Sequence, residues 1–173
     1  MTLPIRLYPD PVLRQVARPV GTVDERARAL VEDLLQAMYQ AEGRGLAAPQ
    51  VGALSRIFVM DTRWKEGPPR PIAFIDPEVL DVAPVSELGA EACLSIPGRV
   101  VPVWRPVAVT LAWTDQRGRP QKARFEGIDA RCILHELDHL DGILCIDRVA
   151  EDPAGEGAGG EISGDAPGAA GPQ

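Results

Sequence analysis

Apolar side chains recur every three or four positions across residues 22–43, a spacing that predicts an amphipathic helix. The repeating apolar positions are Ala27, Leu30, Val31, Leu34, Leu35, Met38 and Ala41. Thr22, followed three residues later by Glu25, resembles a capping box at the start of this helix, and Gly43 is expected to end it. We expect the apolar face of this helix to cover one face of a sheet.

Short apolar runs typical of β-strands follow between Arg56 and Phe125. The clearest are "RIFVMDT", "PIAFID" and "VAVTLAWTD", and they are separated by the proline- and glycine-containing stretches "EGPPRP" and "RGRPQ". A second helix is predicted from about Ile128 to Asp141. The order of a helix, several strands and a helix predicts an α+β fold with antiparallel β-sheets.

The composition divides the 173 residues into a domain of residues 1–150 and a tail of residues 151–173. The tail consists mainly of Gly, Ala and Pro, with five acidic residues and no Lys or Arg, so we expect it to be disordered. The net charge of −7 comes largely from the tail, because residues 1–150 contain 20 acidic and 18 basic residues. This balance offers no basic face for direct binding of nucleic acid.

Three cysteines, Cys93, Cys132 and Cys145, have no spacing that suggests a disulfide framework. The opening "MTLPIRLYPD" has no apolar core of a secretory signal, and no run of about 18 apolar residues suggests a membrane span. We therefore expect a cytoplasmic protein with reduced cysteines and no membrane partner.

The stretch "LHELDHLDG", residues 134–142, contains both histidines of the chain. On a helix, His135 and His139 would lie on one face about 6 Å apart along the axis. The pattern H-E-x-x-H is typical of two metal ligands with a glutamate, here Glu136, as general base. The alternatives are a chance match to the pattern, or two histidines that are satisfied by hydrogen bonds.

A third ligand is expected upstream of His135. The chain has no further histidine, and the acidic residues far downstream of His139 lie in the glycine-rich tail. Cys93 in "EACLSIPG" would complete a three-ligand set with a fourth position open for water, although a buried free cysteine is the common alternative. Cys132 would place three ligands in a line on one helix, so we expect it to line a pocket beside the metal. Cys145 is expected in the core.

The stretch "GRGLAAPQVG", residues 43–52, has small residues that allow a close approach of its backbone, and Gln50 adds a neutral amide donor. It lacks the lysine and the G-x-x-x-x-G-K-[ST] pattern of a phosphate-binding loop.

Together, these three stretches resemble the peptide deformylase family. That family has the motifs G-x-G-x-A-A-x-Q, E-G-C-L-S and Q-H-E-x-D-H in this order, and their counterparts here are residues 43–50, 91–95 and 134–139. The opening "YPDPVLRQVARPV" and the later "HLDGILCID" extend the resemblance over most of residues 1–150.

The resemblance implies antiparallel sheets packed around a central helix that carries H-E-x-x-H, with a further helix near the N-terminus. It also implies an Fe(II) hydrolase, often active with Ni(II), Co(II) or Zn(II), that removes the N-formyl group from the initiator methionine of nascent proteins and releases formate. By this resemblance Cys93, His135 and His139 bind the metal, and Glu136 is the general base and acid. The remaining implied roles are oxyanion stabilisation by Gln50 and the Leu94 backbone N–H, and peptide binding by Gly45.

Glu91 and Asp138 would support the ligands through hydrogen bonds or ion pairs, with ordinary surface charge as the alternative. The chain departs from the family motifs at Ala92, Leu134 and Arg44. Arg44 would narrow or polarise the entrance of the substrate pocket, with a side chain that points to solvent as the alternative. All three departures bear on rate and side-chain preference rather than on the reaction.

Two alternatives are a divergent paralogue that hydrolyses another N-acyl group and a non-catalytic metal- or peptide-binding module. The presence of Glu136 and Gln50 argues against the second, because binding alone needs neither. The expected partners are N-formyl-methionyl nascent peptides near the ribosome. Since ribosomal RNA is polyanionic, we do not expect the acidic tail to mediate that proximity.

Overall fold

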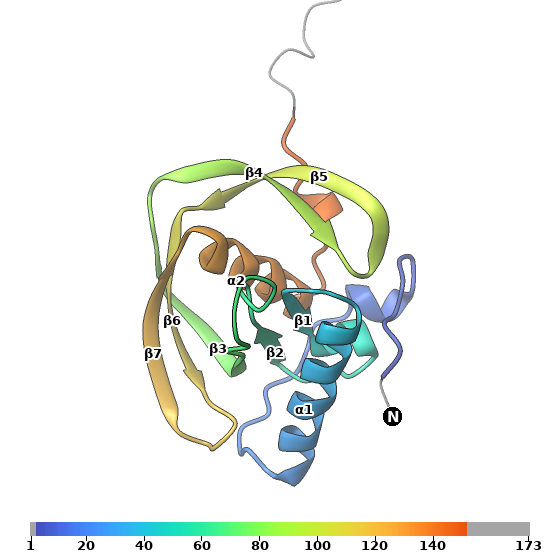
Figure 1. The fold of residues 1–173 in the computed structure, drawn as a ribbon, viewed down its shortest axis with the longest axis vertical. Coiled ribbons are helices and arrows are strands. Elements are labelled where there is room, and N and C mark those ends of the chain that lie inside the picture. Colours follow the sequence, from blue (N-terminus) through green and yellow to red (C-terminus); the bar gives the residue numbers. More distant parts are fainter. Residues whose placement is uncertain (1–2, 152–173) are drawn as a thin grey trace, which may run out of the picture.

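A computed structural model describes residues 3–151 (Figure 1). Its elements are, in order, a 3-10 helix at Pro11–Arg14, α1 at Glu25–Gln40, β1 at Gly45–Ala47, a 3-10 helix at Ala48–Val51, β2 at Ile57–Met60, β3 at Ile72–Val82, β4 at Ser86–Cys93, β5 at Ile96–Pro106, β6 at Ala108–Thr114, β7 at Pro120–Glu126, α2 at Gly127–Leu140, and a 3-10 helix at Cys145–Asp147. The predicted tail lies outside the described residues except for Glu151.

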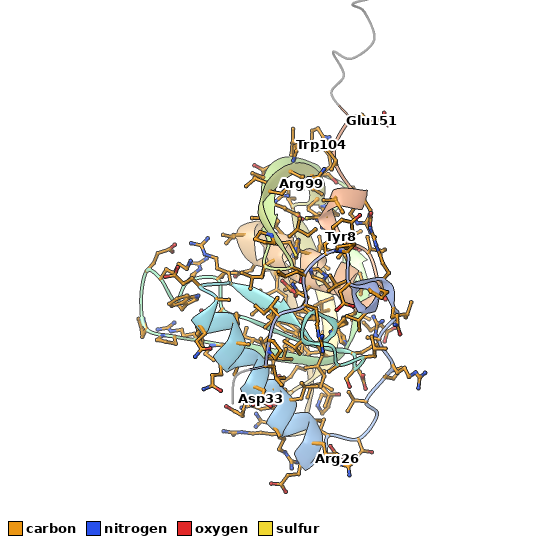
Figure 2. The ribbon with its side chains drawn as sticks, turned by 90° about the vertical axis from the view of Figure 1, so that its right-hand side faces the viewer. Tyr8, Arg26, Asp33, Arg99, Trp104 and Glu151 are labelled. Carbon is orange, nitrogen blue, oxygen red and sulfur yellow. The ribbon has the colours of Figure 1, made fainter. Side chains whose placement is uncertain are left out.

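The strands form two antiparallel sheets, so the predicted α+β class is confirmed. One sheet has five strands in the order β1-β2-β3-β6-β7, and the other is the β4–β5 hairpin. In Figure 1, α2 lies in the middle of the molecule, the hairpin passes above it, and α1 lies at the periphery beside β1. Figure 2 shows Trp104 and Glu151 at the hairpin end of the molecule, far from Arg26 and Asp33 of α1.

The buried apolar residues form three clusters that place α2 between the sheets. Val31, Leu34 and Met38 of α1 pack on β1, β2 and β3. On the other face of the five-stranded sheet, Ile133 and Leu140 of α2 pack with core residues that include Phe58, Phe74, Val109 and Leu111. A third cluster lies under the hairpin and contains Cys93 and Cys145, which confirms the core position predicted for Cys145.

Asp24, and not Thr22, caps the N-terminus of α1. The Asp24 carboxylate accepts a hydrogen bond of 2.9 Å from the Ala27 N–H, so the predicted capping box of Thr22 and Glu25 is wrong. An Asp side chain at the N-cap position satisfies a free helical N–H and carries charge that favours the positive end of the helix dipole.

The C-terminus of α1 also differs by one residue from the prediction. Glu42, with φ of 56°, takes the left-handed position, while the Gly43 N–H returns to the Met38 carbonyl oxygen at 2.9 Å. The Glu42 N–H donates to the Tyr39 carbonyl oxygen at 3.1 Å, and these two hydrogen bonds form a Schellman motif. The residue with positive φ in this motif is usually a glycine, but here it is Glu42.

The β4–β5 hairpin lies within the region predicted to contain strands but was not among the runs named, and the short strand β1 lies outside that region. Strand β4 reads "SELGAEAC" and has no apolar alternation, and β1 has only three residues within the glycine-rich stretch. No helix within residues 3–151 is both long and apolar enough to cross a membrane.

We expect Glu42→Gly to raise the free energy of unfolding by up to about 1 kcal/mol, because glycine adopts positive φ without the clash of a Cβ atom. Asp76 is the matched control, since its φ of 49° is also positive, but its carboxylate accepts 2.8 Å hydrogen bonds from the N–H groups of Val20 and Gly21. Asp76→Gly should therefore be destabilising. Urea unfolding of both variants measures the difference, and a destabilised Glu42→Gly would contradict this account.

Candidate metal centre

Helix α2 and the end of β4 bring three potential metal ligands together. The Nε2 atoms of His135 and His139 lie 3.2 Å apart, and Cys93 Sγ lies 3.3 Å from His139 Nε2. All three donor atoms lie within 4.8 Å of one another and all three residues are largely buried.

These separations fit a tetrahedral metal site. Metal–nitrogen bonds of about 2.05 Å and a metal–sulfur bond of about 2.3 Å place tetrahedral donors about 3.3 Å apart for two nitrogens and about 3.6 Å apart for nitrogen and sulfur. A thiolate and two neutral imidazoles suit borderline metals such as Fe, Co, Ni and Zn. The donor set therefore fits a catalytic divalent ion, with room in the coordination shell for a fourth ligand.

Cys93 is held by the turn that joins β4 to β5. It pairs with Ile96 across a two-residue connection, after a register shift that follows Ala92. The buried Gln50 side chain braces this turn, because its Nε2 donates to Ser95 Oγ at 3.1 Å and lies 3.7 Å from Cys93 Sγ. Ala92 does not adopt a positive φ, so alanine introduces no left-handed strain at this family-motif glycine position.

Glu91, two residues before Cys93, fixes the ring of His135. The His135 Nδ1–H donates to Glu91 Oε2 at 2.9 Å, which leaves Nε2 directed at the other two donors. A carboxylate behind a ligating imidazole sets its tautomer and orientation and increases its basicity.

A network of buried charged side chains surrounds Glu91 and extends to Asp138 on α2. Arg105 on β5 donates to both carboxylate oxygens of Glu91 at 2.8 and 3.0 Å, and to Asp138 at 2.7 Å. Arg148 holds Asp138 from the other side at 2.5 and 2.7 Å, and Arg131 of α2 donates to Glu91 at 3.1 Å. Glu91 is thus a buried partner of His135 and of arginines, and Asp138 is a buried partner of arginines; neither is an ordinary surface charge.

Burial alone would raise the pKa of Glu91, but hydrogen bonds from His135 and Arg105 lower it to about 2. Glu91 is therefore ionised at neutral pH and supplies a permanent negative charge behind His135.

Glu136 has a different environment although it is adjacent to a ligand. It is buried, and its Oε2 has no hydrogen-bond partner within residues 3–151. Burial raises the pKa of Glu136 to about 7, which suits a group that exchanges a proton near neutral pH. An unpartnered carboxylate oxygen beside three metal donors is well placed for a reacting water.

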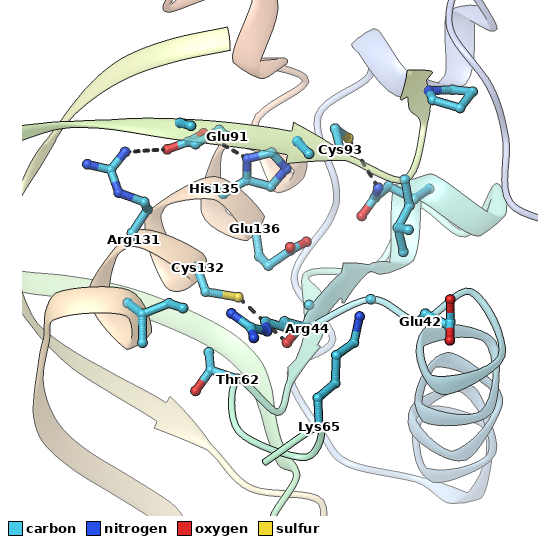
Figure 3. Close-up of a pocket in the computed structure, with 18 of the residues that line it drawn as sticks. Glu42, Arg44, Thr62, Lys65, Glu91, Cys93, Arg131, Cys132, His135 and Glu136 are labelled. Carbon is cyan, nitrogen blue, oxygen red and sulfur yellow. Dashed lines mark hydrogen bonds and ion pairs between the residues drawn. The ribbon is translucent and has the colours of Figure 1, made fainter. Parts of the chain in front are cut away.

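The candidate site opens into a cavity of about 540 Å³ between β1, β4 and α2 (Figure 3). His139 lies behind the cavity wall, and Leu134 packs against the core cluster that contains Phe58. The other predicted site residues line the cavity: Arg44, Gly45, Gln50, Cys93, Leu94, Cys132, His135 and Glu136.

Gly45 is required at its position for space. A Cβ atom there would lie 2.5 Å from Glu136 Oε1 and 2.8 Å from Cys132 Sγ. Strand β1 therefore runs directly against the general-base candidate, and only glycine permits this approach.

Sequence reasoning missed Arg105, Arg131 and Arg148. A signal for Arg105 exists, because it alternates with the buried Val101 and Val103 on the inward face of β5. A charged residue at an inward position requires a buried partner. No comparable local pattern identifies Arg131 or Arg148.

The chain matches known proteins over nearly all of its described part. Residues 2–154 match the family model described as Polypeptide deformylase. A peptide deformylase of Synechococcus sp. (strain CC9605) is 44% identical over 149 residues, which cover 86% of this chain and 74% of the relative. A peptide deformylase of Rhizobium meliloti is 42% identical over 148 residues, which cover 86% and 85%.

Solved structures of peptide deformylases resemble this chain over a similar share of its length. The peptide deformylase from Thermotoga maritima has a TM-score of 0.81 at 40% identity, covering 87% of this chain and 99% of that one. The peptide deformylase from Synechococcus elongatus in complex with actinonin has a TM-score of 0.82 at 42% identity, covering 86% and 80%.

We expect Glu91→Gln to weaken Co(II) binding by about 10- to 100-fold, because the amide removes the charge that orients His135 and increases its basicity. Anaerobic titration, followed by the cobalt–thiolate absorption band, measures the affinity. Cys145→Ser is the matched control, because Cys145 is buried as Glu91 is but is not one of the three donor residues. Equal affinity in Glu91→Gln and wild type would contradict the role of this carboxylate.

Proposed function

This chain belongs to the peptide deformylase family, whose members remove the N-formyl group from nascent peptides by metal-dependent hydrolysis, and we propose that Cys93, His135 and His139 hold the metal for this reaction. The observation that carries the assignment is the convergence of these three donors beside the buried, unpartnered oxygen of Glu136.

From the family resemblance we propose Fe(II) as the native metal, with Ni(II), Co(II) or Zn(II) as substitutes, and one thiolate and two imidazoles can bind all four. When bound, such an ion lowers the pKa of water towards neutrality and polarises the formyl oxygen.

Glu136 is proposed to move the proton. Its carboxylate takes a proton from the attacking water, and the same group then delivers that proton to the nitrogen of the departing methionine. The pKa of about 7 supports both steps, since the group can accept and release a proton near neutral pH.

Gln50 and the backbone N–H of Leu94 are proposed to stabilise the negative charge that develops on the formyl oxygen. Gln50 and Leu94 both line the cavity, as does Cys93. The Gln50 Oε1 accepts a 2.9 Å hydrogen bond from the Ala47 N–H, which fixes the amide so that its Nε2 faces Cys93. Preorganised donors of this kind contribute about 100-fold or more each to the rate.

The peptide chain is proposed to run past the β1 wall of the cavity. Gly45 would offer backbone hydrogen bonds there, and Cys132 and Arg44 would border the methionine side chain. The carbonyl oxygen of Arg44 accepts a weak hydrogen bond from Cys132 Sγ at 3.7 Å, so these two walls are in contact.

The substrate implies where the protein acts. We propose that it works in the cytoplasm on N-formyl-methionyl peptides close to the ribosome, without using the acidic residues 151–173 for attachment, and without binding nucleic acid or membrane. The match to peptide deformylases over both sequence and fold does not favour a divergent acylase or a non-catalytic module.

Glu136→Gln should reduce formate release from formyl-Met-Ala-Ser by about 1,000-fold or more while Co(II) affinity stays within a few-fold of wild type, because the amide keeps the shape but cannot accept the proton. Formate is measured with metal-loaded protein prepared without oxygen. Substantial turnover in this variant would remove Glu136 from the proposed role.

Gly45→Ala is expected to reduce kcat by at least about 10-fold, since the added Cβ would displace the Glu136 carboxylate from a position only 2.5 Å away. Gly67→Ala is the control, because a Cβ atom there meets nothing within 4 Å. If both variants retain wild-type kcat, the close approach of β1 is not needed for proton transfer.

A further inference from the structure

The connection between β2 and β3 forms a rigid rim on the cavity. Its first residue, Asp61, is buried and accepts hydrogen bonds from the Tyr39 hydroxyl at 2.8 Å and from the Arg70 N–H at 2.7 Å. These bonds fix both ends of the segment 61–70, so that its central turn has a defined position.

Trp64 holds this turn against the C-terminal end of α1 and the segment that leads into β1. Its Nε1–H donates to the Gly43 carbonyl oxygen at 2.8 Å, and its ring packs edge-on against Tyr39 with centroids 5.3 Å apart. The next residue, Lys65, is thereby presented at the cavity rim, with its Nζ 5.4 Å from the Trp64 ring centroid. Figure 3 shows the Lys65 side chain extending from the β2–β3 connection towards the space between Arg44 and Glu42.

Lys65 differs from the other two cations that line the cavity, because their charges are already engaged. The Arg44 guanidinium pairs with Glu66 at 3.0 Å. Arg131 donates to Glu91 at 3.1 Å and to the carbonyl oxygens of Val103 and Glu87 at 3.0 and 2.8 Å. Within residues 3–151, Lys65 forms no ion pair with a carboxylate.

We propose that Lys65 is a specificity-determining residue that favours substrates with an acidic side chain among the residues immediately after the formyl-methionine. The inference rests on the proposed function, which places the formyl group at the metal donors. Lys65 reaches the cavity from the β2–β3 connection, on the Glu42 side of Arg44 and away from Cys93 and His135, so its ammonium meets the peptide beyond the methionine pocket and not the reacting bond.

Glu42 supplies the opposing charge at the same rim. It lines the cavity and, like Lys65, forms no ion pair within the described residues. The two charges predict opposite effects: removing Lys65 should weaken the preference for acidic peptides, and removing Glu42 should strengthen it. A general loss of stability could not produce this pair of opposite shifts.

The test compares kcat/KM for isosteric pairs of C-terminally amidated peptides, formyl-Met-Ala-Glu against formyl-Met-Ala-Gln and formyl-Met-Asp-Ala against formyl-Met-Asn-Ala. In at least one pair, the wild-type kcat/KM should be about threefold higher for the acidic peptide than for its amide counterpart at low salt. This is the size of effect that a solvent-exposed ion pair produces. The difference should lie in KM rather than kcat and should shrink at high salt.

Lys65→Glu should reverse this preference, and Lys65→Met should bring the ratio close to one. Glu42→Gln should raise the ratio, and Lys122→Glu, an exposed change on β7 outside the cavity, should leave it unchanged. A wild-type ratio near one for both pairs, or a ratio that Lys65→Glu and Lys122→Glu shift equally, would overturn the inference. Absence of formate from every peptide would instead contradict the proposed function itself.

Discussion

The buried carboxylate of Glu91 is the interaction on which the site depends. It joins the β4–β5 hairpin to α2, because it lies on β4, accepts hydrogen bonds from Arg105 on β5, and accepts another from His135 on α2. Burying a charge is unfavourable unless it is paired and hydrogen-bonded, and losing one partner of such a buried pair typically costs about 3–5 kcal/mol. The network therefore couples folding of the hairpin onto α2 with the orientation of a metal ligand.

The same constraint explains why α2 is covered on both sides. Its apolar residues, such as Ile133 and Leu140, pack on the five-stranded sheet, whereas His135, Asp138 and His139 face the hairpin side. Polar residues can be buried on that face because arginines and Cys93 meet them there. Glu136, which lacks such partners, differs from Glu91 in its pKa for this reason: one carboxylate is stabilised as an anion and the other is free to exchange a proton.

Much of the fold class and the candidate ligands could be predicted from the sequence, since helical spacing and the H-E-x-x-H pattern are local. The α+β class and the buried position of Cys145 followed from apolar patterning. The β4–β5 hairpin could not be predicted in this way, because β4 has no alternation of apolar residues and pairs only with β5. The ends of α1 were missed for a similar reason: Asp24 acts through one side-chain hydrogen bond and Glu42 through a left-handed backbone conformation, and periodicity reveals neither.

The most direct test of the account is X-ray absorption on anaerobically metal-loaded protein. A site built from Cys93, His135 and His139 predicts one sulfur at about 2.3 Å and two imidazole nitrogens at about 2.0–2.1 Å, with the remaining position taken by oxygen. The sulfur signal should disappear in Cys93→Ser and persist in Cys132→Ser. A coordination shell without sulfur in the wild-type protein, or a sulfur signal that survives Cys93→Ser, would contradict the account.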